Sequence, residues 1–140
     1  MKIKLSTEWL SGCAGCHVAV ADLHEKLLEM VEQIEFVRIP VLMDEKGYPA
    51  ADVGLIEGAV RSEHDRRAAE KMRESCRTLI AFGTCASFGG PSGIGWLYPP
   101  ATVLEEVYGK GQTNVPGQLP DADAPVLEKS VVPVHDVVAI

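Results

Sequence analysis

The sequence is poor in the features that mark several classes of protein. Aromatic residues make up only 6% of its 140 residues, and 13 Lys and Arg stand against 20 Asp and Glu. The resulting net charge of −7 repels phosphate backbones, so we expect no nucleic-acid partner. No apolar run approaches the roughly 18–20 residues of a membrane-spanning helix, so we expect no membrane span.

Cysteine is also scarce, with four residues in all. The first residues contain neither an apolar signal segment nor paired arginines, and we therefore expect a cytoplasmic protein. Structural disulfides are rare in that reducing compartment. A close Cys-x-x-Cys pair in such a chain indicates metal binding or redox chemistry instead.

The composition is otherwise that of a globular protein, with 46% hydrophobic and 24% charged residues. A chain of this length buries roughly two-thirds of its unfolded surface on folding, which is enough for a core. We expect one domain over residues 1–140.

Apolar periodicity predicts strands alternating with helices. An apolar residue recurs every three or four positions, as in one long amphipathic helix, at Val20, Leu23, Leu27, Val31 and Ile34. Ser62 with Asp65 predicts a capping box at the start of a second helix. Strands are expected over 2–9, 34–42, 52–56, 78–82 and 131–140, and a short helix over 101–108.

Three details refine this pattern. Pro40 favours an edge position for its strand, and the continuous apolar run 78–82 predicts a strand buried on both faces. The segment 110–130, rich in Gly, Pro and Asp, reads as a surface excursion or lid. Alternation of this kind predicts an α/β fold with a flavodoxin-like, doubly wound parallel sheet.

Three cysteines and one glutamate follow the predicted strands. Cys13 and Cys16 follow the first strand, Glu57 the third and Cys85 the fourth. Ligands of such sheets bind beyond the carboxyl ends of the strands, so these residues are expected at one rim. Backbone N–H groups at the following helix start favour negative charge, which suits thiolates.

The Cys-x-x-Cys pair by itself leaves three chemistries open. Zinc sites, thiol–disulfide oxidoreductases and iron–sulfur proteins all use it. Adding Cys85 favours an iron–sulfur cluster, with Thr84 and Ser87 as candidate hydrogen-bond donors to sulfur. His17 is a further candidate donor. Cys76 should lie at the opposite end of the sheet as a buried structural thiol.

Three motifs then carry a resemblance to a known family. They are Trp9-Leu10-x-x-Cys13-x-Gly15-Cys16, Ile56-Glu57-Gly58-Ala59-Val60 and Gly83-Thr84-Cys85-Ala86-x-x-Gly89-Gly90. Together they resemble the small subunit of nickel–iron hydrogenases, and the tail 134–138 is also similar. The residues in and around these motifs, and the missing export signal, resemble those of the cytoplasmic, methyl-viologen-reducing type. The related complex I subunit usually has adjacent cysteines in the first motif, which favours the hydrogenase.

The resemblance implies a role for each matching residue. Cys13, Cys16 and Cys85 would bind the proximal 4Fe-4S cluster, and Glu57 would lie at the interface with the large subunit, with a role there or in proton transfer. The nickel–iron centre would belong to that large subunit, so this chain would have no hydrogenase activity alone. A heterodisulfide reductase-type protein is the implied electron acceptor.

The chain departs from the family pattern in one respect. The fourth cluster ligand of the family lies in a Gly-Cys-Pro-Pro motif after the last strand of this domain, and the 140 residues contain no such motif. We therefore expect a segment of a longer chain, truncated at its C-terminal end, or an unusual ligand such as Glu57. A metal-free scaffold that docks on the large subunit is a third functional class beside the electron-transfer subunit and the thiol–disulfide oxidoreductase.

Overall fold

The computed structural model describes residues 2–110, 113–115, 117–120 and 124–140. Its strands are β1 (Ile3–Trp9), β2 (Ile34–Arg38), β3 (Ala51–Glu57), β4 (Val60–Ser62), β5 (Cys76–Ala81) and β6 (Leu127–Val132). Its α-helices are α1 (Gly15–Ala21), α2 (Glu25–Gln33), α3 (Glu63–Ser75), α4 (Thr84–Phe88) and α5 (Pro100–Leu104), and further helical turns span Pro91–Leu97, Glu105–Gly109 and Val134–Asp136.

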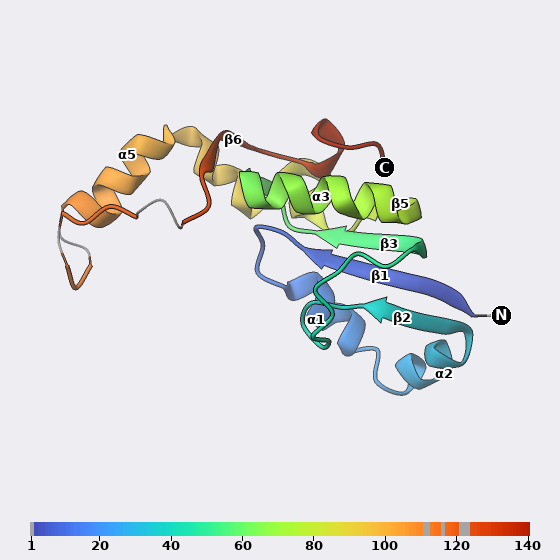
Figure 1. Ribbon diagram of the computed structural model, residues 1–140. Coiled ribbons are helices and arrows are strands. Elements are labelled where there is room, and N and C mark those ends of the chain that lie inside the picture. The colour runs from blue at the N-terminus through green and yellow to red at the C-terminus, as the bar shows by residue number, and fades with distance from the viewer. Residues whose placement is uncertain (1, 111–112, 116, 121–123) are drawn as a thin grey trace.

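The centre of the molecule is a four-stranded parallel sheet in the order β2-β1-β3-β5. The arrows of β1, β2 and β3 point the same way, with α3 on one side of the sheet and α1 near the arrowheads on the other (Figure 1). The expected α/β fold with a parallel, flavodoxin-like sheet is confirmed, and so is the edge position of the strand that precedes Pro40. β4 and β6 form a separate antiparallel pair.

The strand register decides which face of the sheet each residue occupies. Ser6, Gly54 and Leu79 are paired across three strands and face α3, where Ser6 Oγ lies 3.6 Å from Met72 Sδ. Because side chains alternate along a strand, Thr7 and Leu55, its partner on β3, face α1 instead. A Cβ on Gly54 would lie only 2.9 Å from Leu79 Cδ1, so the α3 face packs tightly.

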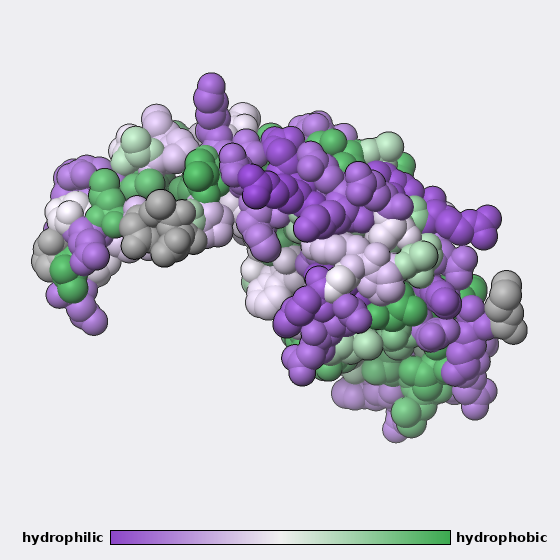
Figure 2. All heavy atoms as spheres, viewed as in Figure 1, coloured by the Kyte–Doolittle hydropathy of each residue, from purple (hydrophilic) through white to green (hydrophobic). Residues whose placement is uncertain are grey.

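The opposite face is less completely covered. An apolar cavity of about 310 Å³ separates the sheet from α1 and α2, and its lining includes Val20, Leu27 and Val31. Figure 2 shows hydrophobic residues reaching the surface around α2 and β2, whereas hydrophilic residues cover α3. Within the described residues, neither α1 nor α2 has a fully buried side chain.

Four local predictions are wrong for identifiable reasons. The single helix through residues 20–34 is two helices, because the backbone turns at His24 with φ +49°. The second strand ends at Arg38 rather than residue 42, because the chain turns there and the Ile39 carbonyl accepts from the Leu42 and Met43 N–H groups. Only one face of β5 is covered: Leu79 is buried, whereas Thr78 and Ile80 are exposed, Ile80 by 44%. The last strand ends at Val132, because Pro133 has no N–H to continue the ladder.

The predicted lid over residues 110–130 falls partly outside the described residues. Its described C-terminal end forms the start of β6. The predicted helix over 101–108 is confirmed as α5 followed by a wider helical turn, and α5 extends away from the sheet (Figure 1).

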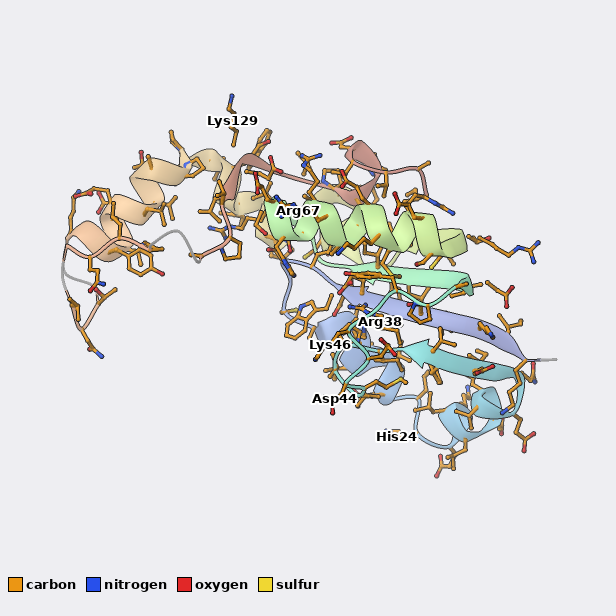
Figure 3. The ribbon with its side chains drawn as sticks, in the orientation of Figure 1. His24, Arg38, Asp44, Lys46, Arg67 and Lys129 are labelled. Atoms are coloured by element: carbon orange, nitrogen blue, oxygen red, sulfur yellow. The ribbon has the colours of Figure 1, made fainter. Side chains whose placement is uncertain are left out.

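A buried charge network, absent from the sequence predictions, fastens the segment after β2 to the sheet. Arg38 lies at the end of β2 (Figure 3), with Nη1 2.9 Å from the Glu8 carboxylate. Tyr48 donates from its hydroxyl to the same carboxylate at 2.7 Å, and its ring centre lies 4.5 Å from the Arg38 guanidinium. Burial, the Glu8 hydrogen bond and the Glu8 charge raise the pKa of Tyr48.

The predicted capping box starts α3. Ser62 Oγ accepts from the Asp65 N–H at 3.2 Å, and Asp65 Oδ2 accepts from the Ser62 N–H at 2.9 Å. The same buried oxygen accepts from Ser11 Oγ at 2.9 Å, which ties the segment after β1 to the start of α3. The cap therefore also supports the loop that carries Cys13.

Replacing Ser62 by Ala should lower the free energy of unfolding by about 1–2 kcal/mol, because Asp65 loses a donor and its N–H loses an acceptor. Urea unfolding followed by circular dichroism measures the change. Glu70→Ala, at an exposed position of the same helix, is the control and should change the free energy by less than about 0.5 kcal/mol. Equal losses in both variants would contradict the assigned cap.

Candidate metal centre

The Cys13–Cys16 loop begins where β1 ends. Ser11, which lies between β1 and Cys13, remains paired with the segment after β3. Its N–H donates to the Ala59 carbonyl at 3.2 Å, and the Ala59 N–H donates to the Ser11 carbonyl at 2.9 Å. Ala14 then takes a left-handed conformation with φ +61°, and α1 starts at the next residue. This turn places an exposed Cys13 before the helix and a half-buried Cys16 in its first turn.

Cys85 occupies the equivalent place after β5. It is the second residue of α4, and Gly83 at the N-cap has φ +87°. A Cβ on Gly83 would collide with Cys16 Sγ, so the two cysteine loops meet at this point. The convergence expected at the carboxyl ends of the strands is therefore visible in the backbone.

Glycine lies against each of the three sulfur atoms. A Cβ on Gly15 would lie 3.1 Å from Cys13 Sγ, and one on Gly90 would lie 3.0 Å from Cys85 Sγ. Gly83 is the corresponding neighbour of Cys16. The absence of a side chain at these positions leaves room around soft thiol donors, which fits the ligand chemistry of an iron–sulfur cluster.

A single metal ion makes a different demand on the site. Four thiolates around one zinc ion each lie about 2.3 Å from it, so they nearly touch one another. In the part of the chain that the structure describes, no three His, Cys, Asp or Glu side chains form such a group. Thiolates around an iron–sulfur cluster are held apart by its own iron and sulfide atoms.

Glu57 anchors the start of α1. It is the last residue of β3 and is 3% exposed, and its Oε2 accepts from the Cys16 N–H at 3.0 Å. Its other oxygen bonds His17 Nδ1, while His17 Nε2 lies 2.7 Å from Thr7 Oγ1. Both oxygens of Glu57 and both ring nitrogens of His17 are thus engaged within the chain.

The strand register explains why these groups meet. Trp9 of β1 pairs with Glu57, and Thr7 pairs with Leu55, so Thr7 and Glu57 project from the same face of the sheet. That face is the one on which α1 lies, with His17 in its first turn. The sequence predicts Glu57 at the rim but not Thr7 beside it, because the pairing register is needed to assign the face of Thr7.

The thiol of Cys16 is harder to ionise than an ordinary cysteine. Burial raises its pKa to about 11, and a hydrogen bond with Glu57 and the negative charges of Glu57, Cys13 and Cys85 act in the same direction. The expectation that the helix start favours thiolates therefore does not hold for metal-free Cys16. The main reason is burial of the thiol, and the neighbouring Glu57 carboxylate adds to it.

The hydroxyl groups near Cys85 are arranged differently from the expectation. Thr84 starts α4 directly before Cys85. Ser87 Oγ donates to the Ala81 carbonyl at 3.4 Å, whereas Ser92 Oγ lies 3.7 Å from Cys85 Sγ. The sequence predicts only a loop at Ser92. The Gly-Gly-Pro run before it indicates a turn, but it does not indicate that the turn brings Ser92 to Cys85.

Cys76 lies at the far end of the sheet, as expected. It starts β5, is 5% exposed and belongs to the hydrophobic core. Its sulfur packs against Gly54, where an added Cβ would lie 2.6 Å away. The prediction of a buried structural thiol is confirmed.

A family model matches most of this architecture. The model for the NADH ubiquinone oxidoreductase, 20 Kd subunit, matches residues 13–135, from the first cysteine to the tail beyond β6. The chain belongs to this family. The match covers all three cysteines of the candidate centre and Glu57.

Several curated relatives of the chain are hydrogenase subunits. A subunit of the vhu F420-non-reducing hydrogenase of Methanocaldococcus jannaschii is 39% identical over 141 residues, which cover all of this chain and 49% of the relative. The NAD-reducing hydrogenase HoxS subunit delta of Cupriavidus necator is 36% identical over 142 residues, covering 98% of this chain and 68% of the relative. The chain thus spans about half the length of the first relative.

A solved structure has the same fold. A chain from the crystal structure of an NAD+-reducing [NiFe]-hydrogenase in the H2-reduced state superposes with a TM-score of 0.94 at 33% sequence identity. The superposition covers all of this chain and 79% of that chain. The resemblance to hydrogenase small subunits, stated from three motifs, is confirmed.

In the metal-free chain, alkylation of Cys16 by iodoacetamide should increase with pH around a midpoint near 11, because only the thiolate reacts. Glu57→Gln removes one of the negative charges that raise this pKa, so the midpoint should move down toward 9.0. Tandem mass spectrometry assigns the modified residue. Glu63→Gln, an exposed carboxylate on α3, is the matched control and should leave the midpoint unchanged. A midpoint below 9 in the native chain would contradict the assignment.

Proposed function

We propose that the chain is part of the electron-transfer subunit of a nickel–iron hydrogenase. In this proposal Cys13, Cys16 and Cys85 hold a proximal 4Fe-4S cluster, and residues 1–140 form one iron–sulfur domain. The observation that carries the proposal is the meeting of two cysteine loops, in which Cys16 Sγ lies against Gly83 two residues before Cys85. The hydrogenase subunits among the relatives give the reaction to which such a centre would belong.

The residues of the chain would hold and shield the cluster. When bound, a 4Fe-4S cluster accepts and releases one electron at a time. The three cysteines would supply thiolates, and the glycines beside their sulfurs would let the backbone approach closely. The Glu57 carboxylate would hold the Cys16 backbone by accepting from the Cys16 N–H. The Cys13–Cys16 loop would then keep its conformation when the cluster gains or loses an electron.

His17, Thr84 and Ser87 complete the proposed surroundings of the cluster. His17 would act through Glu57, to which its ring is bonded. Glu57 and His17 are both largely buried, so a role of Glu57 in proton transfer near the large subunit would use this internal hydrogen-bonded chain. Thr84 would act from the start of α4, directly before Cys85. Ser87 would support α4 itself rather than donate to a sulfur, because its hydroxyl donates to the Ala81 carbonyl.

An exposed apolar surface beside Cys85 supports a large-subunit partner. Phe88 in α4 is 81% exposed, and four further large side chains of the next turn are each more than 60% exposed: Ile94, Trp96, Leu97 and Tyr98. Phe88, Ile94, Trp96 and Leu97 line one pocket. Exposed apolar patches of this kind mark protein–protein contacts. The nickel–iron centre would belong to that partner, and this chain alone would not turn over dihydrogen.

Two further expectations belong to the same proposal. All four cysteines are free thiols, as a cluster-binding protein of a reducing compartment requires, and we place the chain in the cytoplasm. A heterodisulfide reductase-type protein would accept the electrons. No described helix has the length and apolarity to cross a membrane.

Anaerobic reconstitution with iron and sulfide should give a brown protein with three to four irons per chain or per assembled complex. Cys85→Ser should lose most of this iron and the visible absorption, because one of three thiolate ligands is removed. Cys76→Ala is the matched control and should keep both, since that thiol lies in the core at the far end of β5. Iron analysis and absorption spectra measure the outcome.

The same samples separate the alternatives. Zinc as the sole metal, without a chromophore, would support a zinc-binding domain and overturn the proposal. Disulfide reduction that survives in Cys85→Ser would support a thiol–disulfide oxidoreductase. A complex that forms with the large subunit but contains no metal on this chain would leave only a docking scaffold.

A further inference from the structure

We propose that Ser92 is a positioning residue that joins the two cysteine loops and raises the reduction potential of the cluster. The inference rests on the proposed function, since it concerns the cluster that Cys85 would bind. The supporting juxtaposition is that Ser92 Oγ lies 2.9 Å from the Ser11 carbonyl oxygen and 3.7 Å from Cys85 Sγ. Ser92 therefore contacts the loop that leads to Cys13 as well as the sulfur of Cys85.

The backbone after α4 brings Ser92 to this place. Gly89 and Gly90 both have positive φ, at +84° and +48°, and they turn the chain back over the start of α4. A Cβ on Gly90 would lie 2.8 Å from the Cys85 backbone nitrogen, so this return can be this close only with glycine. Gly93 N–H then donates to the Gly89 and Gly90 carbonyls at 2.8 and 3.0 Å, which holds Ser92 in a closed turn.

The partner on the other side is equally fixed. Ser11 is bonded in both directions to Ala59, and its hydroxyl donates to the buried carboxylate of Asp65. Its carbonyl oxygen therefore keeps the Ala59 N–H as a donor even when Ser92 does not donate to it. The Ser92 hydroxyl can therefore donate either to the Ser11 carbonyl or to Cys85 Sγ, and in both cases the Ser11 carbonyl keeps a hydrogen bond.

The charge on Cys85 Sγ determines which of the two acceptors receives the Ser92 hydroxyl proton. A serine hydroxyl has one proton and rotates to suit its acceptors. A neutral thiol is a weak acceptor, so in the metal-free chain the proton goes to the Ser11 carbonyl. A metal-bound thiolate carries negative charge and attracts the proton more strongly, because hydrogen bonds to ionised acceptors are stronger than those to neutral ones.

Reduction of the cluster makes this hydrogen bond stronger. The added electron increases the negative charge shared by the cluster and its thiolates, so a donor at Cys85 stabilises the reduced form more than the oxidised form. The donor therefore raises the reduction potential. Ser87, which donates to the Ala81 carbonyl instead, lacks this effect.

The test compares Ser92→Ala, Ser92→Thr and Ser87→Ala in the full-length protein assembled with its large subunit under anaerobic conditions. A redox titration monitored by electron paramagnetic resonance gives the midpoint potential, and iron analysis gives the cluster content. In Ser92→Ala the reduced-to-oxidised ratio at a fixed potential should fall three- to tenfold, where tenfold corresponds to about 59 mV for one electron. Cluster content should stay unchanged.

The two other variants should keep the native potential. Ser92→Thr retains the hydroxyl, and Ser87→Ala removes one that points elsewhere. An unchanged potential in Ser92→Ala, with or without loss of iron, would overturn the inference and leave Ser92 at most as a tether. Absence of any cluster in the native protein would contradict the proposed function instead.

Discussion

The hydrogen bonds of the Glu57 carboxylate are the interaction on which the candidate centre depends. A buried carboxylate is costly unless it is fully paired, and Glu57 is paired by the Cys16 N–H and by His17, which in turn contacts Thr7. These bonds connect the end of β3, the start of α1 and the middle of β1. They fix where α1 begins, and with it the positions of both cysteines of the first loop.

Glycine makes the complementary contribution at the same edge. Gly83 turns the chain into α4 with a positive φ and leaves space for Cys16 Sγ, while Gly90 lets the chain pass directly over Cys85. A side chain at either position would both strain the backbone and push a sulfur atom away. The centre is therefore built from close backbone approaches, and the acidic and hydroxyl side chains hold those approaches in place.

The two faces of the sheet are stabilised in different ways. The α3 face is closed by tight contacts of Gly54 with the core and by the capping box at Ser62. The α1 face contains an apolar cavity and carries the polar chain from Thr7 to Glu57 at its rim. The loosely packed α1 face thus adjoins the Cys13–Cys16 loop, whereas the tightly packed α3 face holds the strands together from the other side.

The sequence by itself determined the class of fold, the α3 cap and the rim at which Cys13, Cys16 and Cys85 meet, because alternating apolar runs and local motifs are encoded over short distances. It did not predict the break at His24, the exposure of Ile80, the raised pKa of Cys16 or the approach of Ser92 to Cys85. Tertiary structure alone decided these features. The register of parallel strands sets which side chains share a face of the sheet. Turns such as the one at Gly89 and Gly90 set which distant groups reach a sulfur atom.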